Sequence, residues 1–300
     1  EYYLTLRNCI VDQIERETGI LTTKNKSKKF IYQNFINFLV KACKLQMSLY
    51  IIEILLKKEG IEAIFIDQLD GFPYSGITAL AIRRNIYIGT SEANQKKLFL
   101  RKGFIYEWLP LDKDLKNIEN LNLDSLNNIL NKYKRSYLSN KKSTSPLIKE
   151  YKLLSKDINS SKNIFNARRK NGFVLLHSFT DQARMRLQHS WYESFLDWFL
   201  ETIEFCNQNK NMNWFFKAHP CENDYPIKNQ TKDLVLNAIN NNNFSYINSN
   251  NDLSHEDLAQ FASVIVTCNG TCKIEYPPLF NVPVISCISD YMVYDPLIYS

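Results

Sequence analysis

The alternation of short apolar runs with longer amphipathic segments between residues 172 and 287 most constrains the fold of this chain. Apolar runs rich in β-branched and aromatic residues predict strands at 173–179, 213–220, 244–250, 263–270 and 282–287. Helical periodicity predicts helices in the intervals, at 191–210, 231–242, 254–262 and 271–281. Strands that alternate with helices indicate βαβ units and a parallel sheet. We therefore expect a doubly wound α/β domain in this half of the chain.

The N-terminal part of the chain repeats this alternation on a smaller scale. Residues 30–59 have apolar positions at helical spacing and stop at Gly60, a natural helix end. A strand at 61–67, a helix at 77–85 and a second strand at 86–90 then make one further βαβ unit. A second α/β domain is therefore expected here.

A change of composition separates the two domains. Residues 111–171 are polar and rich in Asn, Lys and Ser, with scattered Leu, which indicates a connecting region that contains helices. We place an incomplete α/β domain at 1–110 and the second domain at 172–300. The chain begins at Glu1 rather than Met and stops without an obvious terminal element, so we expect it to be truncated at one or both ends. The expected architecture is two Rossmann-like domains that face a cleft.

The charge balance limits the partners of the chain. Lys+Arg number 37 and Asp+Glu number 31, a formal net charge of +6, and no long basic stripe of the kind that nucleic-acid binders carry is present. The densest basic stretches, 24–29 and 132–142, are interpreted either as solvated loops or as a patch that faces anionic lipid. We expect no nucleic-acid partner.

The seven cysteines form neither CxxC pairs nor a disulfide framework. Cys268 and Cys272 are four positions apart, but no second pair of zinc-type ligands accompanies them. Free thiols in a reducing cytoplasm are the simplest interpretation. No signal peptide and no apolar run of the ~18 residues that a membrane span needs are visible. We expect a cytoplasmic chain.

A small polar loop between a strand and a helix is the first candidate site. The strand ends at Thr267, and the loop 268–271 precedes a helix whose free N–H groups and positive dipole end can bind an anion. Gly270 permits close backbone approach, and the Thr271 hydroxyl can donate to a phosphate oxygen. Glu275 lies one helical turn further, where its carboxylate could accept both hydroxyls of a ribose. Alternatively, Thr271 only caps the helix and Glu275 is exposed.

The segment "NWFFKAHPCEND" (213–224) is the second candidate. Its apolar strand runs into Lys217, His219 and Pro220, and the carboxyl ends of strands in open α/β sheets are where ligands bind. A histidine donor and a lysine cation would complement a phosphate, while Pro220 fixes the turn. The alternative is a surface loop with a solvated histidine.

These motifs, in this order, resemble those of the capsule polysaccharide biosynthesis family. That family comprises bacterial GT-B glycosyltransferases related to Kdo transferases and, more distantly, to polysialyltransferases and CDP-glycerol transferases. The resemblance covers about residues 172–290 and implies that the Lys-x-His-Pro pattern and a later Ser-Ser loop bind the donor phosphates, while a glutamate binds the ribose. In this chain Gly270 and Thr271 occupy the Ser-Ser position, a departure that leaves one hydroxyl where the family has two. The implied phosphate-binding residues are Lys217, His219, Asn269, Gly270 and Thr271, and the implied ribose-binding residue is Glu275.

The resemblance also implies a catalytic base in the N-terminal domain. Polysialyltransferase-like relatives carry an acidic-acidic-Gly motif there, and this chain has Leu69-Asp70-Gly71, so the first acidic position is absent. Asp70 is the candidate base and Asp67 the second choice; alternatively, Asp70-Gly71 is an ordinary turn.

The remaining polar candidates follow the first strand of the second domain. His177 and Asp181 are expected to border the cleft, or else to be satisfied structural groups. His189 and His255 are interpreted as structural.

The expected function is therefore a GT-B-like glycosyltransferase with Asp70 and His219 in catalytic roles. It would transfer a sugar from a nucleotide donor, CMP-linked by resemblance, to a polysaccharide or lipid-linked acceptor, with possible peripheral contact at the inner membrane face. No DxD-like pair stands beside the loops, so we expect neither a metal nor another cofactor. Two alternatives stay open: a nucleotide-sugar epimerase of the same architecture, and a non-catalytic nucleotide- or polyanion-binding module.

Overall fold

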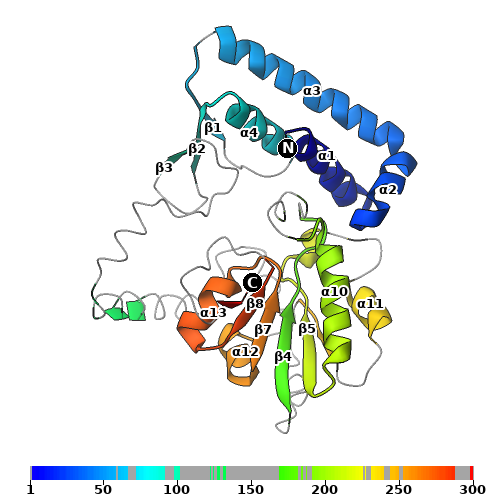
Figure 1. Cartoon of the computed structure of the whole chain (residues 1–300), viewed down its shortest axis with the longest axis vertical. Helices are drawn as coiled ribbons and strands as arrows, with labels where there is room; N and C mark the ends of the chain where they lie inside the picture. Colours follow the sequence, from blue (N-terminus) through cyan, green and yellow to red (C-terminus); the bar gives the residue numbers. More distant parts are fainter. Residues whose placement is uncertain are drawn as a thin grey trace. The chain divides into compact units, whose positions relative to one another are not determined.

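The computed structural model describes most of the two regions expected to be α/β. The described residues are 2–58, 60–66, 72–91, 98–101, 122, 124, 127–128, 131–132, 169–181, 184, 187, 191–225, 227, 231–239, 244–249, 253–287 and 298–299. They belong to two compact units, one made of Glu1–Trp108 with Phe179–Asp197 and the other of Leu109–Ser178 with Trp198–Ser300 (Figure 1).

The first unit contains four α-helices and a small sheet in its described part. The helices are α1 (Tyr2–Thr18), α2 (Ser27–Gln33), α3 (Phe35–Lys58) and α4 (Tyr74–Arg83), and the strands are β1 (Ala63–Ile66), β2 (Tyr87–Ser91) and β3 (Leu98–Arg101). β1 and β2 are parallel across α4, which confirms the predicted βαβ unit, and β3 pairs antiparallel with β2. Neither α1 nor β3 was predicted from the sequence.

The predicted helix at 30–59 is divided into α2 and α3. The division falls at Asn34, whose side-chain amide donates to the carbonyl of Phe30 at 3.0 Å. Competition of this kind between an Asn side chain and the backbone ladder favours a helix end. α3 then ends at Lys58, and Gly60 has the left-handed φ of +59° that suits a helix C-terminus.

The segment 179–197, predicted to belong to the second domain, is part of the first unit. The fully buried guanidinium of Arg184 donates to Asp12 at 3.0 Å and to Glu15 at 2.6 Å, both on α1. Asp197 accepts the backbone N–H of Lys24 at 3.1 Å. These bonds between positions far apart in sequence attach the segment to α1 and its neighbours.

The second unit has a six-stranded sheet in the order β6-β5-β4-β7-β8-β9, and all its strands are parallel. The strands are β4 (Lys170–Leu175), β5 (Met212–Lys217), β6 (Phe244–Ile247), β7 (Val264–Thr267), β8 (Val284–Ser286) and β9 (Ile298–Tyr299). This is the Rossmann order, in which the chain reverses its direction of winding between the first and fourth strands. The predicted doubly wound domain is confirmed, and β9 is a strand that the sequence analysis did not assign.

Helices cover both faces of this sheet. They are α10 (Phe195–Gln208), α11 (Thr231–Ala238), α12 (His255–Phe261) and α13 (Cys272–Phe280), as Figure 1 shows. On one face, Phe199 of α10 packs edge-to-face on Phe216, with ring centroids 6.3 Å apart. On the other face, Leu258 of α12 and Tyr276 of α13 join the buried cluster around Phe173. Burial on both sides explains why the strands read as continuous apolar runs.

α12 begins with a capping box. Ser254 is the N-cap, its hydroxyl oxygen accepts the N–H of Asp257 at 3.1 Å, and the Asp257 carboxylate accepts the N–H of Ser254 at 3.0 Å. This reciprocal pair satisfies two donors that the helix cannot satisfy itself.

Candidate functional site

Three loops meet at the carboxyl edge of the six-stranded sheet: 176–178 after β4, 218–221 after β5 and 268–271 after β7. The sheet register aligns the last residues of these strands, with Leu175 between Lys217 and Thr267. The loop after β4 therefore lies between the other two. The β4/β7 junction is the topological switch point, where open α/β sheets bind ligands.

His177 joins the two predicted motifs. Its imidazole stacks on that of His219, with ring centroids 5.8 Å apart and an interplanar angle of 15°. On the other side, the backbone N–H of Asn269 donates to His177 Nε2 at 3.3 Å. His219 and the loop 268–271 are thus brought to one edge of the sheet through a buried third residue.

The hydrogen bonds assign the tautomers of both imidazoles. The backbone N–H of Cys221 donates to His219 Nδ1 at 3.2 Å, and Ser178 Oγ lies 3.0 Å from the same nitrogen. Because a backbone N–H can only donate, Nδ1 is an acceptor, and neutral His219 carries its proton on Nε2. By the same reasoning, neutral His177 carries its proton on Nδ1. His219 therefore has an Nε2–H donor suited to an anionic oxygen.

The loop leaves little room for a side chain at Gly270. A β-carbon at this position would lie 2.9 Å from Cys272 Sγ and 3.1 Å from Thr267 Oγ1, and no left-handed φ is involved. Thr271 occupies the N-cap position of α13, but its hydroxyl makes no capping hydrogen bond and the residue is exposed. Glu275 follows one turn later, is half-buried, and donates its N–H to the Thr271 carbonyl at 3.1 Å.

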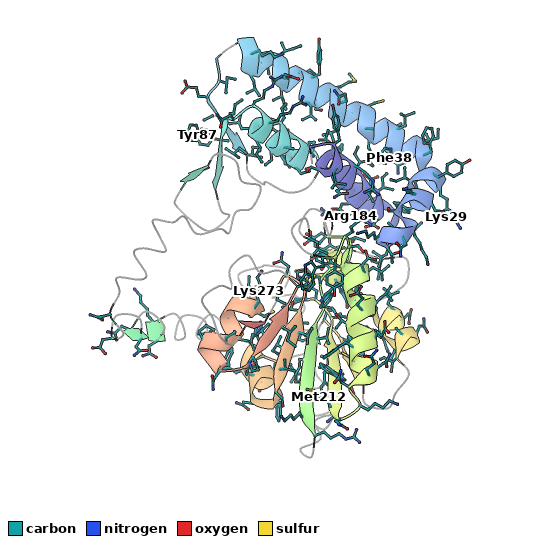
Figure 2. All side chains as sticks on the ribbon, in the orientation of Figure 1. Lys29, Phe38, Tyr87, Arg184, Met212 and Lys273 are labelled. Carbon is teal, nitrogen blue, oxygen red and sulfur yellow. The ribbon has the colours of Figure 1, made fainter. Side chains whose placement is uncertain are left out.

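Lys273 is a component of this region that the sequence analysis missed. Its side chain is buried, and Nζ donates to the Asn269 side-chain oxygen at 3.0 Å (Figure 2 labels Lys273). The available signal was a cation in the first turn of a helix, where the dipole disfavours positive charge. Such a cation is stabilised when an anion binds beside it.

Lys217 contributes a second cation at the end of β5. Burial lowers the pKa of its ammonium group to about 8, although Glu222 opposes the shift. The side chain keeps some solvent exposure. Lys217, Lys273, the His219 donor and the start of α13 give this edge of the sheet a positive character that suits a phosphate.

The other predicted residues are placed as follows. Asp67 and Asp70, the candidate bases, lie outside the described residues, as does His189. Asp181 is buried in the segment that belongs to the first unit. His255 Nδ1 lies 2.9 Å from the Tyr276 hydroxyl, a contact between α12 and α13 that is consistent with a structural role.

The cysteines near the loop are buried thiols. Cys268 Sγ lies 3.0 Å from Cys287 Sγ, and burial is the largest cause that raises the pKa of Cys268 well above its usual value. Burial also raises the pKa of Cys272 to about 12. In the described part of the chain, no group of three or more His, Cys, Asp and Glu side chains could hold a metal ion. The described helices include none that is long and apolar enough to cross a membrane.

Comparison with known proteins gives matches among solved structures alone: no family model and no curated protein matches the chain. It is similar to the KpsC beta Kdo 2,4 transferase of Thermosulfurimonas dismutans, with 14% identity and a TM-score of 0.40 over 75% of this chain and 67% of that one. It is also similar to the UDP-GlcNAc 2-epimerase of Methanocaldococcus jannaschii, with 15% identity and a TM-score of 0.30 over 81% of this chain and 64% of the enzyme. The epimerase from Neisseria meningitidis gives 15% identity, a TM-score of 0.30 and coverages of 79% and 62%.

Proposed function

We propose that the chain is a GT-B-type glycosyltransferase, metal-independent, that moves a sugar from a nucleotide donor to a polysaccharide or lipid-linked acceptor. One observation carries the proposal: His219 and the loop 268–271 meet through His177 at the switch point of a Rossmann-ordered sheet. The resemblance of the motifs to capsule polysaccharide transferases favours CMP as the nucleotide.

The chemical role of this edge is stabilisation of the leaving group. When the donor bond breaks, negative charge develops on the nucleotide phosphate, and preorganised donors that meet this charge lower the barrier. The Nε2–H of His219, the backbone at 270–271 and the cations Lys217 and Lys273 would serve as these donors. Glu275 would accept the ribose hydroxyls.

The acceptor hydroxyl needs a base that faces the anomeric carbon of the sugar. A carboxylate within hydrogen-bond reach of the acceptor hydroxyl would take its proton as the new bond forms. Asp70 is the proposed base, and Asp67 is the second choice. The residues proposed to bind the nucleotide belong to the second unit, whereas both candidate bases belong to the first.

Calorimetric titration with CMP, CDP and UDP tests the binding half of the proposal. We expect binding that weakens by about tenfold or more in His219→Ala, because a charge-assisted hydrogen bond to phosphate is lost. Lys217→Met should weaken it similarly, while Lys232→Met, on an exposed lysine of α11, should not. Equal affinity in all variants would contradict the proposed site.

Incubation with CMP- and UDP-sugars tests the catalytic half. Slow release of free nucleotide that disappears in Asp70→Asn, with binding retained, is the result expected of a transferase. Conversion of a UDP-sugar to its C2 epimer would instead identify an epimerase, and binding without turnover, unchanged by Asp70→Asn, would identify a binding module.

A further inference from the structure

One face of α3 exposes an unusual amount of apolar surface. Six large side chains on this face are from 45% to 71% exposed, and we call them the α3 stripe: Ile36, Val40, Met47, Tyr50, Ile51 and Ile54. Successive members are three, four or seven positions apart, except that Tyr50 and Ile51 are adjacent. At 3.6 residues per turn all six fall within a sector of about 100° on one side of the helix. Figure 2 shows side chains projecting along the length of α3. The stripe is roughly 28 Å long at the helical rise of ~1.5 Å per residue.

The opposite face of α3 is already occupied. Leu45, Leu49 and Leu56 are at most 8% exposed and pack in the core of the first unit with residues of α1 and α4. The helix is therefore apolar on both sides, and helices of this kind are normally covered all round. On the side of the α3 stripe, the described residues leave the apolar side chains exposed.

The charges around the stripe favour an anionic partner. Residues 24–58 contain eight lysines and a single acidic residue, Glu53. Glu53 already pairs with Arg84 and Lys57, whereas Lys26, Lys28, Lys29 and Lys44 are exposed. Two copies joined through this face would bring like charges together, which opposes association. An anionic surface would attract the same charges.

We propose that α2 and α3 dock on the surface of an anionic phospholipid bilayer, with the α3 stripe inserted at the level of the head groups and the lysines on the lipid phosphates. A helix with one apolar side and basic flanks is suited to lie in this plane. Tyr50 within the stripe, and Tyr32 at 82% exposure one turn before it, have the aromatic body and polar hydroxyl favoured at such interfaces. The lysine-rich stretch 24–29, which the sequence left open between loop and lipid patch, faces lipid. This inference does not depend on the identity of the nucleotide or the acceptor.

Sedimentation of the full chain with vesicles tests the proposal. Phosphatidylcholine vesicles with phosphatidylglycerol should bind it, and vesicles of phosphatidylcholine alone should bind at least about tenfold less, because attraction to the lysines is lost. Added salt should weaken binding, since it shortens the range of the attraction. The triple variant Ile36→Gln, Met47→Gln, Ile54→Gln should lose binding by at least about tenfold, because three insertable side chains are gone.

The variants are chosen so that misfolding cannot imitate the result. All three substituted side chains are exposed, so the circular dichroism spectrum and thermal unfolding should be unchanged. Leu236→Gln is the matched control, an apolar side chain 50% exposed on α11 of the other unit, and should bind vesicles like the parent chain. Absence of binding to either vesicle, or a triple variant that binds normally, would overturn the proposal. The proposal would also be overturned if light scattering showed that the parent chain is a dimer, that the triple variant is a monomer and that neither binds vesicles. That result would mean that the α3 stripe contacts a second copy of the chain.

Discussion

The imidazoles of His177 and His219 stack across the ends of β4 and β5, with their centroids 5.8 Å apart. Each ring also accepts a backbone N–H, from Asn269 and Cys221 respectively. The pair therefore fixes the relative positions of three loops whose sequences are far apart.

Replacing His177 should test its bridging role. His177→Phe keeps an aromatic ring against His219 but removes the acceptor for the Asn269 N–H. A buried donor without a partner costs about 1–3 kcal/mol, so we expect a lower free energy of unfolding in urea and about tenfold weaker nucleotide binding. His255→Phe is the control: it loses the contact with Tyr276 and should lower stability, but it should leave binding intact. Unchanged binding in His177→Phe would show that the loops hold their positions without the bridge.

The affinity for an anionic nucleotide should fall as the pH rises through about 8. Burial lowers the pKa of Lys217 to about 8, so its ammonium group loses its proton there and no longer attracts phosphate. Binding an anion favours the protonated form, so proton uptake should accompany binding near this pH. Calorimetry in two buffers of different ionisation enthalpy measures this uptake, and Lys217→Met should abolish it.

The same shift predicts the effect of Lys217 on stability. Its folded-state pKa is below that of the unfolded chain, so its protonation opposes folding, and this cost is fully present below about pH 8 and disappears above the unfolded pKa. In the absence of nucleotide, Lys217→Met should raise the free energy of unfolding at neutral pH by about 1–3 kcal/mol. Urea unfolding at neutral and alkaline pH measures the difference, which should be largest at neutral pH.

Arg184 should be among the most costly residues to replace. Burial would lower the pKa of its guanidinium, but Glu15 and Asp12 outweigh burial and raise the pKa above its usual range. Arg184→Met would leave two buried carboxylates without their cation, and we expect a loss of about 3–5 kcal/mol in the free energy of unfolding. Arg83→Met, on the exposed end of α4, should change it by less than about 0.5 kcal/mol. A loss below about 1 kcal/mol for Arg184→Met would mean that solvent reaches these carboxylates.

Two glycine substitutions should distinguish a steric requirement for glycine from a requirement for a left-handed φ. Gly270→Ala would push the new methyl against Cys272 Sγ and Thr267 Oγ1, so the loop must shift and nucleotide binding should weaken by about tenfold. Gly60→Ala meets no neighbour, but its φ of +59° disfavours a β-carbon, so it should cost about 1 kcal/mol of stability and leave binding unchanged. Titration and urea unfolding of both variants check this contrast.

The alternation of strands and helices predicted most of the fold because buried parallel strands are continuous apolar runs. β9 was missed because a strand of two residues is too short to give a pattern. β3 was not predicted either, although it is as long as β1, β6 and β7. α1 was missed for a different reason: its buried side carries Asp12 and Glu15, which interrupt the apolar pattern. Their partner Arg184 is some 170 positions away, and a single sequence does not show such a pairing.

The candidate site was predictable to the extent that strand ends are visible in sequence. His219 and the loop 268–271 follow apolar runs, and parallel pairing brings such ends to one edge. Ser178 and Lys273 were not found because their importance depends on which atoms they meet, His219 Nδ1 and the Asn269 oxygen. Spacing along the chain does not determine such contacts.

The placement of 179–197 in the first unit has a consequence for dissection of the chain. The polypeptide passes between the units at 108/109, again at 178/179 and again at 197/198, so no single cut separates the chain into one fragment per unit. A fragment that begins at residue 172 would contain Arg184 but lack Asp12 and Glu15, the two carboxylates that accept its hydrogen bonds. Such a fragment would keep Ser178, which contacts the His219 ring, next to a stretch that has lost its partners in the first unit.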